Sequence, residues 1–337
     1  SSMSTRSILG LIYMVQGLKQ LGEDPEPVLS RHGLSIDKLD PGTRISRTTE
    51  QRFYADMAEH LHDSLVGLRL GSYYGLAGYG PLTMLLMTCA TALDAFQMGI
   101  RYQELTYLYG KLHFEPGPDV SALILTPMPM TAHAFRFRVD GEVSGTYKMV
   151  RDMQATMGID LHALRIDMPY ARPEQAAAYE AHFGCPVRFG EPVARFWMRN
   201  EDLRRRLPTA DANAHAMYRQ LCEQQLVAQR QADKRLTDQV LNHLSLFKDH
   251  APTATDVAKA FGLSERTFRR NLTDEGSNYR DLLAQARYEK ARHLLRHTAQ
   301  SIDDIAQHLG YAEAAAFIHA FQRWAGQTPS AFRKSVS

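Results

Sequence analysis

Hydrophobic residues recur at helical spacing through the first hundred residues of the chain. Around Leu11 and Val15, and again around Phe53 and Met57, apolar side chains lie three or four positions apart and so share one helix face. The segment 71–80 carries four glycines and three tyrosines and is predicted to be a loop. The predicted helices cover residues 7–21, 25–32, 49–62 and two stretches from Pro81, a favourable first-turn residue, to about Tyr109.

The periodicity changes after Tyr109. In the stretch 134–139, apolar residues alternate with Arg136 and Arg138, which is the pattern of a half-buried strand. Two prolines at positions 127 and 129 mark a turn before it. Strands are predicted at 120–125, 134–139, 164–168 and 193–198, and helices at 143–157, 173–183 and 211–230. The pattern therefore predicts an α+β N-terminal domain followed by a long polar helix.

Two segments near the C-terminus repeat one another. Asp256-Val257-Ala258, followed by Phe261-Gly262-Leu263, returns 48 positions later as Asp304-Ile305-Ala306, followed by Leu309-Gly310-Tyr311. All six positions keep the same residue character. Two copies with matching positions argue against a simple helical bundle.

Each copy has the local features of a helix-turn-helix. Thr253 and Ser301 stand three residues before an aspartate, the arrangement of an N-terminal capping box. Gly262 and Gly310 supply the left-handed backbone that ends the first helix. Ser264 is a good N-cap for the helix that follows the first turn.

The second helix of the first copy must bury Phe268 and Leu272. Its opposite face then exposes Arg266, Arg269 and Arg270. Arginines on an exposed helix face are suited to guanine edges and phosphates in a major groove. We therefore expect the first copy to read base sequence strongly.

The corresponding helix of the second copy must bury Phe317, Phe321 and Trp324. Alanines on its exposed face could make only apolar contacts, for example with thymine methyl groups. We expect this copy to depend more on DNA shape and phosphate contacts. The residues predicted to be exposed are Glu313, Ala314, Ala315, His319, Gln322 and Arg323.

A strong helical stretch over residues 278–297 joins the two copies. At about 1.5 Å per residue it is roughly 30 Å long. This is close to one turn of B-DNA, about 34 Å. Such a helix could hold two recognition helices in successive major grooves.

At these residues the chain resembles the AraC/XylS family of bacterial transcription regulators. The resemblance covers residues 233–334, and its specific part is Ile305-Ala306-x-x-Leu309-Gly310-Tyr311, then Phe317, Phe321, Gly326, Pro329 and Phe332-Arg333. It implies an all-α C-terminal domain with two helix-turn-helix units joined by a long helix. It also implies cytoplasmic location, promoter binding, contact with RNA polymerase and, in most members, activation of transcription.

The resemblance assigns base reading to Arg266, Arg269 and Arg270 in the first unit and to Ala314, Ala315 and His319 in the second. The two alanines depart from the longer polar residues often found there, which weakens the case for base reading by the second unit. The full set of expected DNA-binding residues is Ser264, Arg266, Thr267, Arg269, Arg270, Ala314, Ala315, His319 and Arg323.

The N-terminal part resembles the non-cupin, arabinose-binding-like domain of a subgroup that includes ornithine, arginine and quorum-linked regulators. The matching residues lie at 66–71, 80–82, 92–95 and 101–102. We therefore expect an effector-binding or dimerisation domain over residues 3–207 and a helical linker over 208–232. The DNA-binding domain is expected over 233–334, and a homodimer is the expected assembly.

Composition adds little that points to another class. The chain has 337 residues, 44% hydrophobic and 23% charged, and a net charge of +2. From position 233 onward, 15 Lys and Arg stand against 12 Asp and Glu, which permits nucleic-acid binding without demonstrating it. Cys89, Cys185 and Cys222 form no CxxC pair. No metal, cofactor, catalytic residue or membrane segment is expected, and the two serines before Met3 are set aside as an expression remnant.

Methionines are frequent in the N-terminal domain, among them Met149, Met153 and Met157. Methionine fills irregular cores and also lines adaptable ligand pockets. Core packing is the default interpretation, and the sharper hypothesis is a small apolar or amphipathic effector. The candidate ligand-binding residues are Met84, Met87, Tyr102, Phe135, Arg136, Phe137 and Arg138.

Two alternatives stay open on the sequence. One is a regulator without a ligand, controlled by its abundance or by a protein partner. The other is an enzyme with a regulatory DNA-binding tail, such as a DNA-repair alkyl acceptor, which would need an activated cysteine. Cys89 in an apolar helix and Cys185 beside Pro186 fit that requirement poorly.

Overall fold

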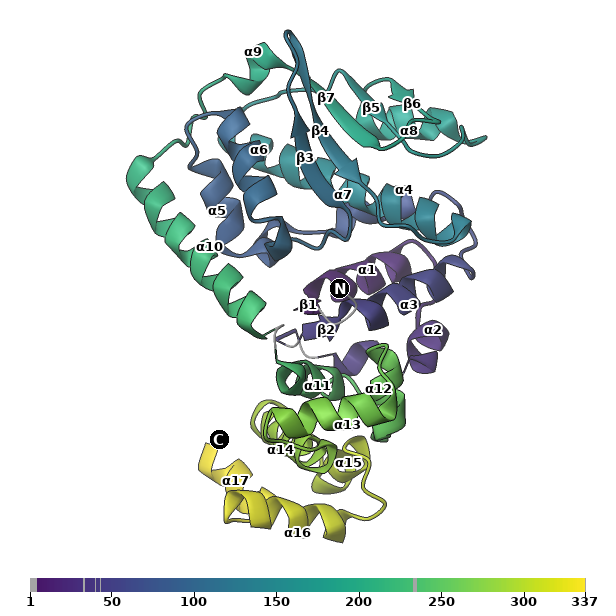
Figure 1. The fold of residues 1–337 in the computed structure, drawn as a ribbon, viewed down its shortest axis with the longest axis vertical. Coiled ribbons are helices and arrows are strands. Elements are labelled where there is room, and N and C mark those ends of the chain that lie inside the picture. The colour runs from purple at the N-terminus through teal and green to yellow at the C-terminus, as the bar shows by residue number, and fades with distance from the viewer. Residues whose placement is uncertain (1–4, 33, 40, 43, 233–234, 337) are drawn as a thin grey trace. The chain divides into compact units, whose positions relative to one another are not determined.

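The computed structural model describes residues 5–32, 34–39, 41–42, 44–232 and 235–336 (Figure 1). The chain divides into two compact units. We call Leu9–Pro25 with Tyr54–Gln229 the α+β unit, and Ser1–Ile8, Glu26–Phe53 and Arg230–Ser337 the helical unit. The helices α3 (Arg47–Ala58) and α10 (Ala212–Ala232) have residues in both.

A five-stranded sheet in the order β3-β4-β7-β5-β6 organises the α+β unit. Its neighbours pair antiparallel except for the parallel pair of β5 and β6. The strands are β3 (Lys111–Glu115), β4 (Val120–Thr126), β5 (Arg165–Asp167), β6 (Val187–Arg188) and β7 (Ala194–Arg199). The sequence predicted β4, β5 and β7 and missed β3 and β6.

The helices of the α+β unit surround this sheet. The helix predicted at 7–21 and the two helical stretches predicted after Pro81 are confirmed, and the predicted glycine-rich loop contains two short 3-10 turns. The elements are α1 (Leu9–Gln20), α4 (Val66–Leu70), η2 (Gly71–Tyr73), η3 (Leu76–Tyr79), α5 (Pro81–Met87), α6 (Ala92–Arg101), η4 (Gln103–Leu105), α7 (Ala132–Met157), α8 (Ala176–Phe183) and α9 (Asn200–Leu203).

The strand predicted at 134–139 was wrong, because these residues form the first turns of the 26-residue helix α7. Phe135 and Val139 pack, with Val143 one turn later, against the sheet core that holds Leu123 and Phe196. The apolar positions therefore follow a spacing of four and not two. The alternating arginines are accommodated because Arg138 is buried and pairs with a glutamate four residues on.

Close helix contact depends on two glycines in the α4–η2 segment. A Cβ at Gly67 would lie 2.7 Å from the carbonyl oxygen of Phe137, and a Cβ at Gly71 would lie 2.3 Å from Ser144 Oγ. Real Cβ atoms do not approach this closely, so a larger residue would push α4 away from α7. These glycines bring the two helices together over several turns.

The helical unit contains the C-terminal helices together with an N-terminal two-stranded sheet. Here β1 (Thr5–Ser7) pairs antiparallel with β2 (Arg44–Ser46). The remaining elements are α2 (Glu26–Arg31), η1 (Ile36–Lys38), α11 (Leu236–Leu244), α12 (Ala254–Ala260), α13 (Glu265–Asp274), α14 (Tyr279–His297), α15 (Ile302–His308), α16 (Ala314–Ala325) and α17 (Pro329–Val336). The helix predicted at 25–32 corresponds to α2, and Gly33, at which the sequence places its end, lies outside the described residues.

Helix α14 takes part in two separate hydrophobic cores. Its first half contributes Tyr279 and Leu282 to a core with α11, α12 and α13. Its second half contributes Leu294 and Leu295 to a core with α15, α16 and α17. Figure 1 shows these two helix groups at α14. The predicted fold, two helix-turn-helix units joined by a long helix, is confirmed.

No helix in the described part of the chain combines the length and apolar character needed to cross a bilayer.

Candidate nucleic-acid interface and ligand cavity

The first helix-turn-helix, α12 and α13, has the predicted caps. Thr253 Oγ1 accepts a hydrogen bond from the Asp256 backbone NH at 3.1 Å, and the Asp256 carboxylate accepts from the Thr253 NH at 3.3 Å. Gly262 ends α12 with a φ of 69°. Ser264 accepts from the Thr267 NH and so begins α13. The reciprocal hydrogen bonds of Thr253 and Asp256 fix where α12 starts, and the Ser264 hydrogen bond fixes where α13 starts.

The arginines of α13 lie on its exposed face. Phe268 and Leu272 are completely buried, and Arg266, Arg269 and Arg270 are exposed on the other side. Since the core fixes the rotation of α13, it also fixes the direction in which the arginines project. A row of guanidinium groups on a short, anchored helix is suited to contacts with base edges and phosphates.

Arg269 is also oriented by a neighbour that the sequence reading did not single out. Its Nε donates to Glu265 Oε1 at 3.0 Å, and Glu265 Oε2 accepts from Thr255 Oγ1 at 2.7 Å. Hydrogen bonds from Thr255 and Arg269 lower the pKa of Glu265, so this carboxylate stays ionised near neutral pH. The hydrogen bonds that run from Thr255 through Glu265 to Arg269 link α12 to the exposed face of α13.

The second helix-turn-helix, α15 and α16, has a similar frame with a less basic surface. Ser301 Oγ accepts from the Asp304 NH, and Gly310 turns the chain with a φ of 83°. The missing side chain at Gly310 lets the backbone at His250 approach, because a Cβ there would lie 3.2 Å from His250 Cα.

The predicted residues of α16 are divided between surface and core. Ala315, His319 and Arg323 are exposed, whereas Ala314 is half-buried and packs against the core of the second unit. Trp324, predicted to be buried, is half-buried beside the same core. Arg323 is thus the permanent positive charge among the predicted contacts of α16.

The end of α14 is closed by an arginine from α17. Arg333 donates through Nε to the Leu295 carbonyl at 3.1 Å and through Nη1 to the Gln300 carbonyl at 2.6 Å. Its Nη2 reaches the Leu294 and Thr298 carbonyls at 3.4 and 3.3 Å. A cation at the negative end of a helix satisfies carbonyls that have no helical partner. Arg333 therefore fastens the second unit to α14.

The α+β unit encloses a cavity of about 170 Å³. Most of its walls are apolar, and α7 supplies a stripe at every fourth residue: Gly141, Gly145, Met149, Met153 and Met157. The other wall residues come mainly from α5, α6, β7, α9 and the segments 106–108 and 159–163. Three of the methionines singled out in the sequence therefore face this space.

The glycines in the cavity wall have no close neighbour that requires glycine. A Cβ at Gly145 would come no nearer than 3.9 Å to Tyr74, and one at Gly141 no nearer than 3.8 Å to the Gly67 carbonyl. A Cβ at Gly99 of α6 would lie 3.9 Å from Leu86. Each glycine inside a helix costs about 0.5–1 kcal/mol relative to alanine. Their visible structural effect is to leave the cavity open.

The predicted ligand-binding residues are scattered, and of the seven Arg138 alone lines the cavity. Tyr102 is buried and donates from its hydroxyl to Glu223 of α10 at 2.9 Å. Phe135 and Phe137 pack inside the unit, Met87 is buried, and Met84 is exposed. Apart from the three methionines, the sequence did not single out the wall residues of α6 and α7, because the convergence of these two helices depends on tertiary packing.

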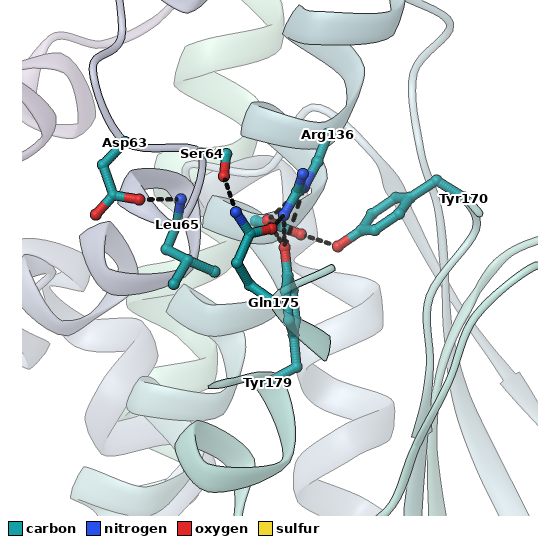
Figure 2. A network of polar contacts seen from close by, with 8 residues as sticks. Asp63, Ser64, Leu65, Arg136, Tyr170, Gln175 and Tyr179 are labelled. Carbon is teal, nitrogen blue, oxygen red and sulfur yellow. Dashed lines mark hydrogen bonds and ion pairs between the residues drawn. The ribbon is translucent and has the colours of Figure 1, made fainter. Parts of the chain in front are cut away.

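Arg136 belongs to a different polar cluster on α7. Figure 2 shows its guanidinium close to Gln175 and Tyr179, and its Nη2 donates to the Tyr179 hydroxyl at 3.1 Å. The hydroxyls of Tyr170 and Tyr179 both donate to Asp140, which is fully buried. Burial raises the pKa of Asp140 to about 7, although both phenols and Arg136 act in the opposite direction. The cluster joins α7 to α8.

None of the three cysteines has the character of an activated nucleophile. Burial raises the pKa of Cys89 to about 12 and the pKa values of Cys185 and Cys222 to about 11. The thiols are therefore protonated at neutral pH. This chemistry is opposite to what an alkyl acceptor requires.

Two capped helix-turn-helix units on one shared helix, with arginines on the exposed recognition helix, define a DNA-binding transcription regulator. Residues 22–207 match the arabinose-binding domain of AraC transcription regulators, N-terminal, and residues 257–335 match a helix-turn-helix domain. The chain belongs to the AraC family of transcription regulators, and the predicted family, class and non-enzymatic function are confirmed.

Relatives of similar length are named as regulators. The HTH-type transcriptional regulator VqsM of Pseudomonas aeruginosa is 29% identical over 282 residues, which cover 80% of this chain and 83% of VqsM. The ornithine utilization regulator of the same species is 27% identical over 80% of this chain and 78% of its own length. The crystal structure of CdpR from P. aeruginosa is 25% identical, covers 91% of this chain and 97% of its own, and aligns with a TM-score of 0.47.

Proposed function

We propose that this regulator is a ligand-controlled activator that acts with RNA polymerase at promoters. Residues 3–207 would bind the effector, 208–232 would form a helical linker, and 233–334 would bind DNA. Activation is the usual mode of the family that the closing motif resembles. The cytoplasm, where bacterial promoters and RNA polymerase are located, is the expected compartment.

The observation that carries ligand control is the cavity bordered by Gly99, Gly141 and Gly145. If the cavity bound no ligand, the domain would be more stable with alanine than with glycine at these helical positions. An effector in this space would change DNA binding only through different affinities for two arrangements of the protein. No chemical reaction is required.

The two helix-turn-helix units are assigned unequal roles in DNA recognition. The Arg266, Arg269 and Arg270 face of α13 would contact base edges, and α16 would contribute mainly phosphate contacts through Arg323. Helix α14 has 19 residues, a length of about 28 Å, which suits two recognition helices placed about one DNA turn apart.

A binding measurement with promoter DNA tests this assignment. Arg269→Ala should cost about 1–3 kcal/mol and relax preference at one base position. Arg323→Ala is the matched comparison, and it should weaken all sequences alike and lower the salt slope by about one. If Arg269→Ala weakened every sequence equally, Arg269 would be a phosphate contact and the assignment to base reading would be wrong.

A homodimer through α10 would complete the regulator. This helix buries Cys222 and Leu226 and exposes Met217, Leu221 and Val227, by 52%, 41% and 50%. At 3.6 residues per turn the three exposed side chains fall within about a third of the helix circumference. Leu221→Glu should shift the mass measured by light scattering from dimer to monomer. Arg219→Gln, at an exposed position about 160° away around the same helix, should leave the mass unchanged. A wild-type monomer at all concentrations would contradict the proposal.

Ligand control is tested by filling the cavity. In a reporter strain, Gly145→Leu should fix transcription at one level across growth conditions to which the wild type responds. Thermal unfolding of the purified variant checks that it is folded. A folded variant that responds like the wild type would favour the alternative, a regulator controlled by abundance or by a protein partner.

A further inference from the structure

Apart from Asp202, the ionic side chains in the wall of the α+β unit's cavity fall into two pairs. The pairs differ in how far the fold already supplies their hydrogen-bond partners. One group, Arg138 with Glu142, is buried in the interior. The other group, Arg151 with His162, lies where the wall meets solvent, and the side chains are 31% and 59% exposed. A ligand's polar head could be held by either group, so the contacts of each decide between them.

The interior pair is engaged by the fold. Arg138 Nη2 donates to the Tyr107 carbonyl at 2.8 Å, and its guanidinium lies 4.3 Å from the Tyr54 ring centre. Glu142 Oε1 accepts from the Gly110 backbone NH at 3.0 Å and from Tyr109 NH, and it lies 3.8 Å from Arg138. The two charges balance each other. A charged ligand group placed there would have to displace structural contacts in a buried place.

The outer pair already holds a carboxylate. Arg151 Nη1 donates to Asp160 Oδ1 at 2.6 Å, and His162 Nε2 lies 3.0 Å from Asp160 Oδ2. Asp160 itself does not line the cavity, and its side chain is 64% exposed. An exposed ion pair of this kind contributes little to stability, so Asp160 can leave at small cost. Asp160 thus occupies the position that a ligand carboxylate would take.

A neutral donor stands beside this position. Gln154 is largely buried and lines the cavity, and its Oε1 accepts from Arg151 Nη1 at 3.0 Å and from the Leu161 NH at 3.3 Å. With its oxygen engaged in this way, its amide NH2 is the part left to donate. Arg151, His162 and Gln154 together present donors at the edge of an otherwise apolar space.

We propose that the cavity binds a small monocarboxylic acid with an apolar body, whose carboxylate replaces Asp160 on Arg151 and His162. This inference rests on the proposed ligand control. The body would lie against Met149, Met153 and Met157, whose flexible side chains adapt to different shapes. The ligand carboxylate would take over the hydrogen-bond donors that Asp160 releases, and burial of the apolar body would add to the affinity.

The size and charge of the cavity limit the acid further. A cavity of about 170 Å³ is close to the roughly 150 Å³ cavity that holds benzene, so it suits a body of roughly six to ten carbon atoms. Glu142 and Asp202 are acidic residues of the wall. Because Arg138 is already paired with Glu142, the second carboxylate of a diacid would be poorly compensated in this interior, so a monoacid is favoured.

The test compares octanoate and 3-phenylpropanoate with their methyl esters on the full chain, by calorimetric titration and thermal unfolding. The acid should bind the wild type, and Arg151→Gln should weaken it by at least about tenfold. Asp160→Asn removes the internal competitor and should strengthen binding by about threefold or more. Lys148→Gln is the matched control, because Lys148 pairs with Asp152 on the same helix and does not line the cavity.

The opposite responses at Arg151 and Asp160 distinguish this site from general apolar binding. The esters should bind more weakly than the acids and should be insensitive to Arg151→Gln. Esters that bind as well as the acids, or acids that ignore both substitutions, would overturn the acid class while leaving ligand control intact. Absence of binding by acids and esters alike also overturns the inference. Ligand control itself fails only if the folded Gly145→Leu regulator responds normally.

Discussion

Replacing Gly145 with alanine should stabilise the α+β unit, because the glycine borders a cavity and has an ordinary helical environment. Alanine in a helix interior gains about 0.5–1 kcal/mol over glycine. The added methyl would meet its nearest neighbour at 3.9 Å, ordinary van der Waals contact, and its burial adds about 0.8 kcal/mol. The sum is about 1–2 kcal/mol, which corresponds to a rise of roughly 2–8 °C in Tm for a unit of this size.

Gly71→Ala is the matched control for this prediction. Gly71 also has helical dihedral angles, with φ −56° and ψ −27°, so alanine would gain a similar helix preference. Its Cβ, however, would lie 2.3 Å from Ser144 Oγ and 2.5 Å from the Gly145 backbone nitrogen. Overpacking of this kind typically costs about 1–3 kcal/mol. Calorimetric unfolding should therefore move the Tm in opposite directions for the two variants.

The reasoning about the cavity would be refuted by a destabilising Gly145→Ala. Such a result would mean that Gly145 serves close packing, as Gly71 does, and that the space beside it is not available to a side chain. A stabilised variant that also binds the acid probes more weakly would support both the empty space and its occupation by a ligand.

Two further predictions concern the buried Asp140 and the half-buried Arg333. Burial raises the pKa of Asp140 from 3.8 to about 7. Between these two values the folded protein keeps the proton on Asp140, whereas the unfolded chain releases it. The free energy of unfolding should therefore fall as the pH rises from about 4 to about 7. The free energy of unfolding of the wild type, measured with denaturant, should fall by about 2 kcal/mol between pH 5.5 and 8, because the slope of 1.36 kcal/mol per pH unit ends near the folded-state pKa of about 7. Asp140→Asn should lack this loss, and parallel profiles for the two proteins would disprove the prediction. Arg333→Met removes the donors that close α14 and should cost about 2–3 kcal/mol. Hydrogen exchange in α15–α17 should then accelerate, whereas Lys334→Met should have little effect, and unchanged exchange in Arg333→Met would contradict the closing role.

The helix-turn-helix units were predictable because local rules determine them. Thr253, Ser264 and Ser301 cap helices through residues three positions away, and Gly262 and Gly310 turn the chain at fixed points. The repeat of 48 positions supplied a second, independent copy of the same signals. Each rule acts over a few residues, so the sequence alone was enough to locate both units.

Contacts between distant residues could not be predicted in this way. Arg333 reaches carbonyls about 35 positions earlier in the chain, and Glu265 bonds Thr255 across the turn of the first unit. Ala314 looked exposed from its helix position, yet the neighbouring core half-buries it. Each of these outcomes depends on how the helices pack, which the spacing along one helix does not contain.

The incorrect strand at 134–139 also concealed the cavity of the α+β unit. Six alternating residues favoured a strand, but oppositely charged side chains four positions apart, Arg136 with Asp140 and Arg138 with Glu142, are the pattern of a helix. Extended over 26 residues, that helix brings Gly141 and Gly145 into line with Met149, Met153 and Met157 at every fourth position. Glycines followed by methionines on one helix face make a wall that leaves space at one end and carries flexible side chains at the other. A longer window for periodicity would therefore have corrected the fold and, with it, pointed to the cavity.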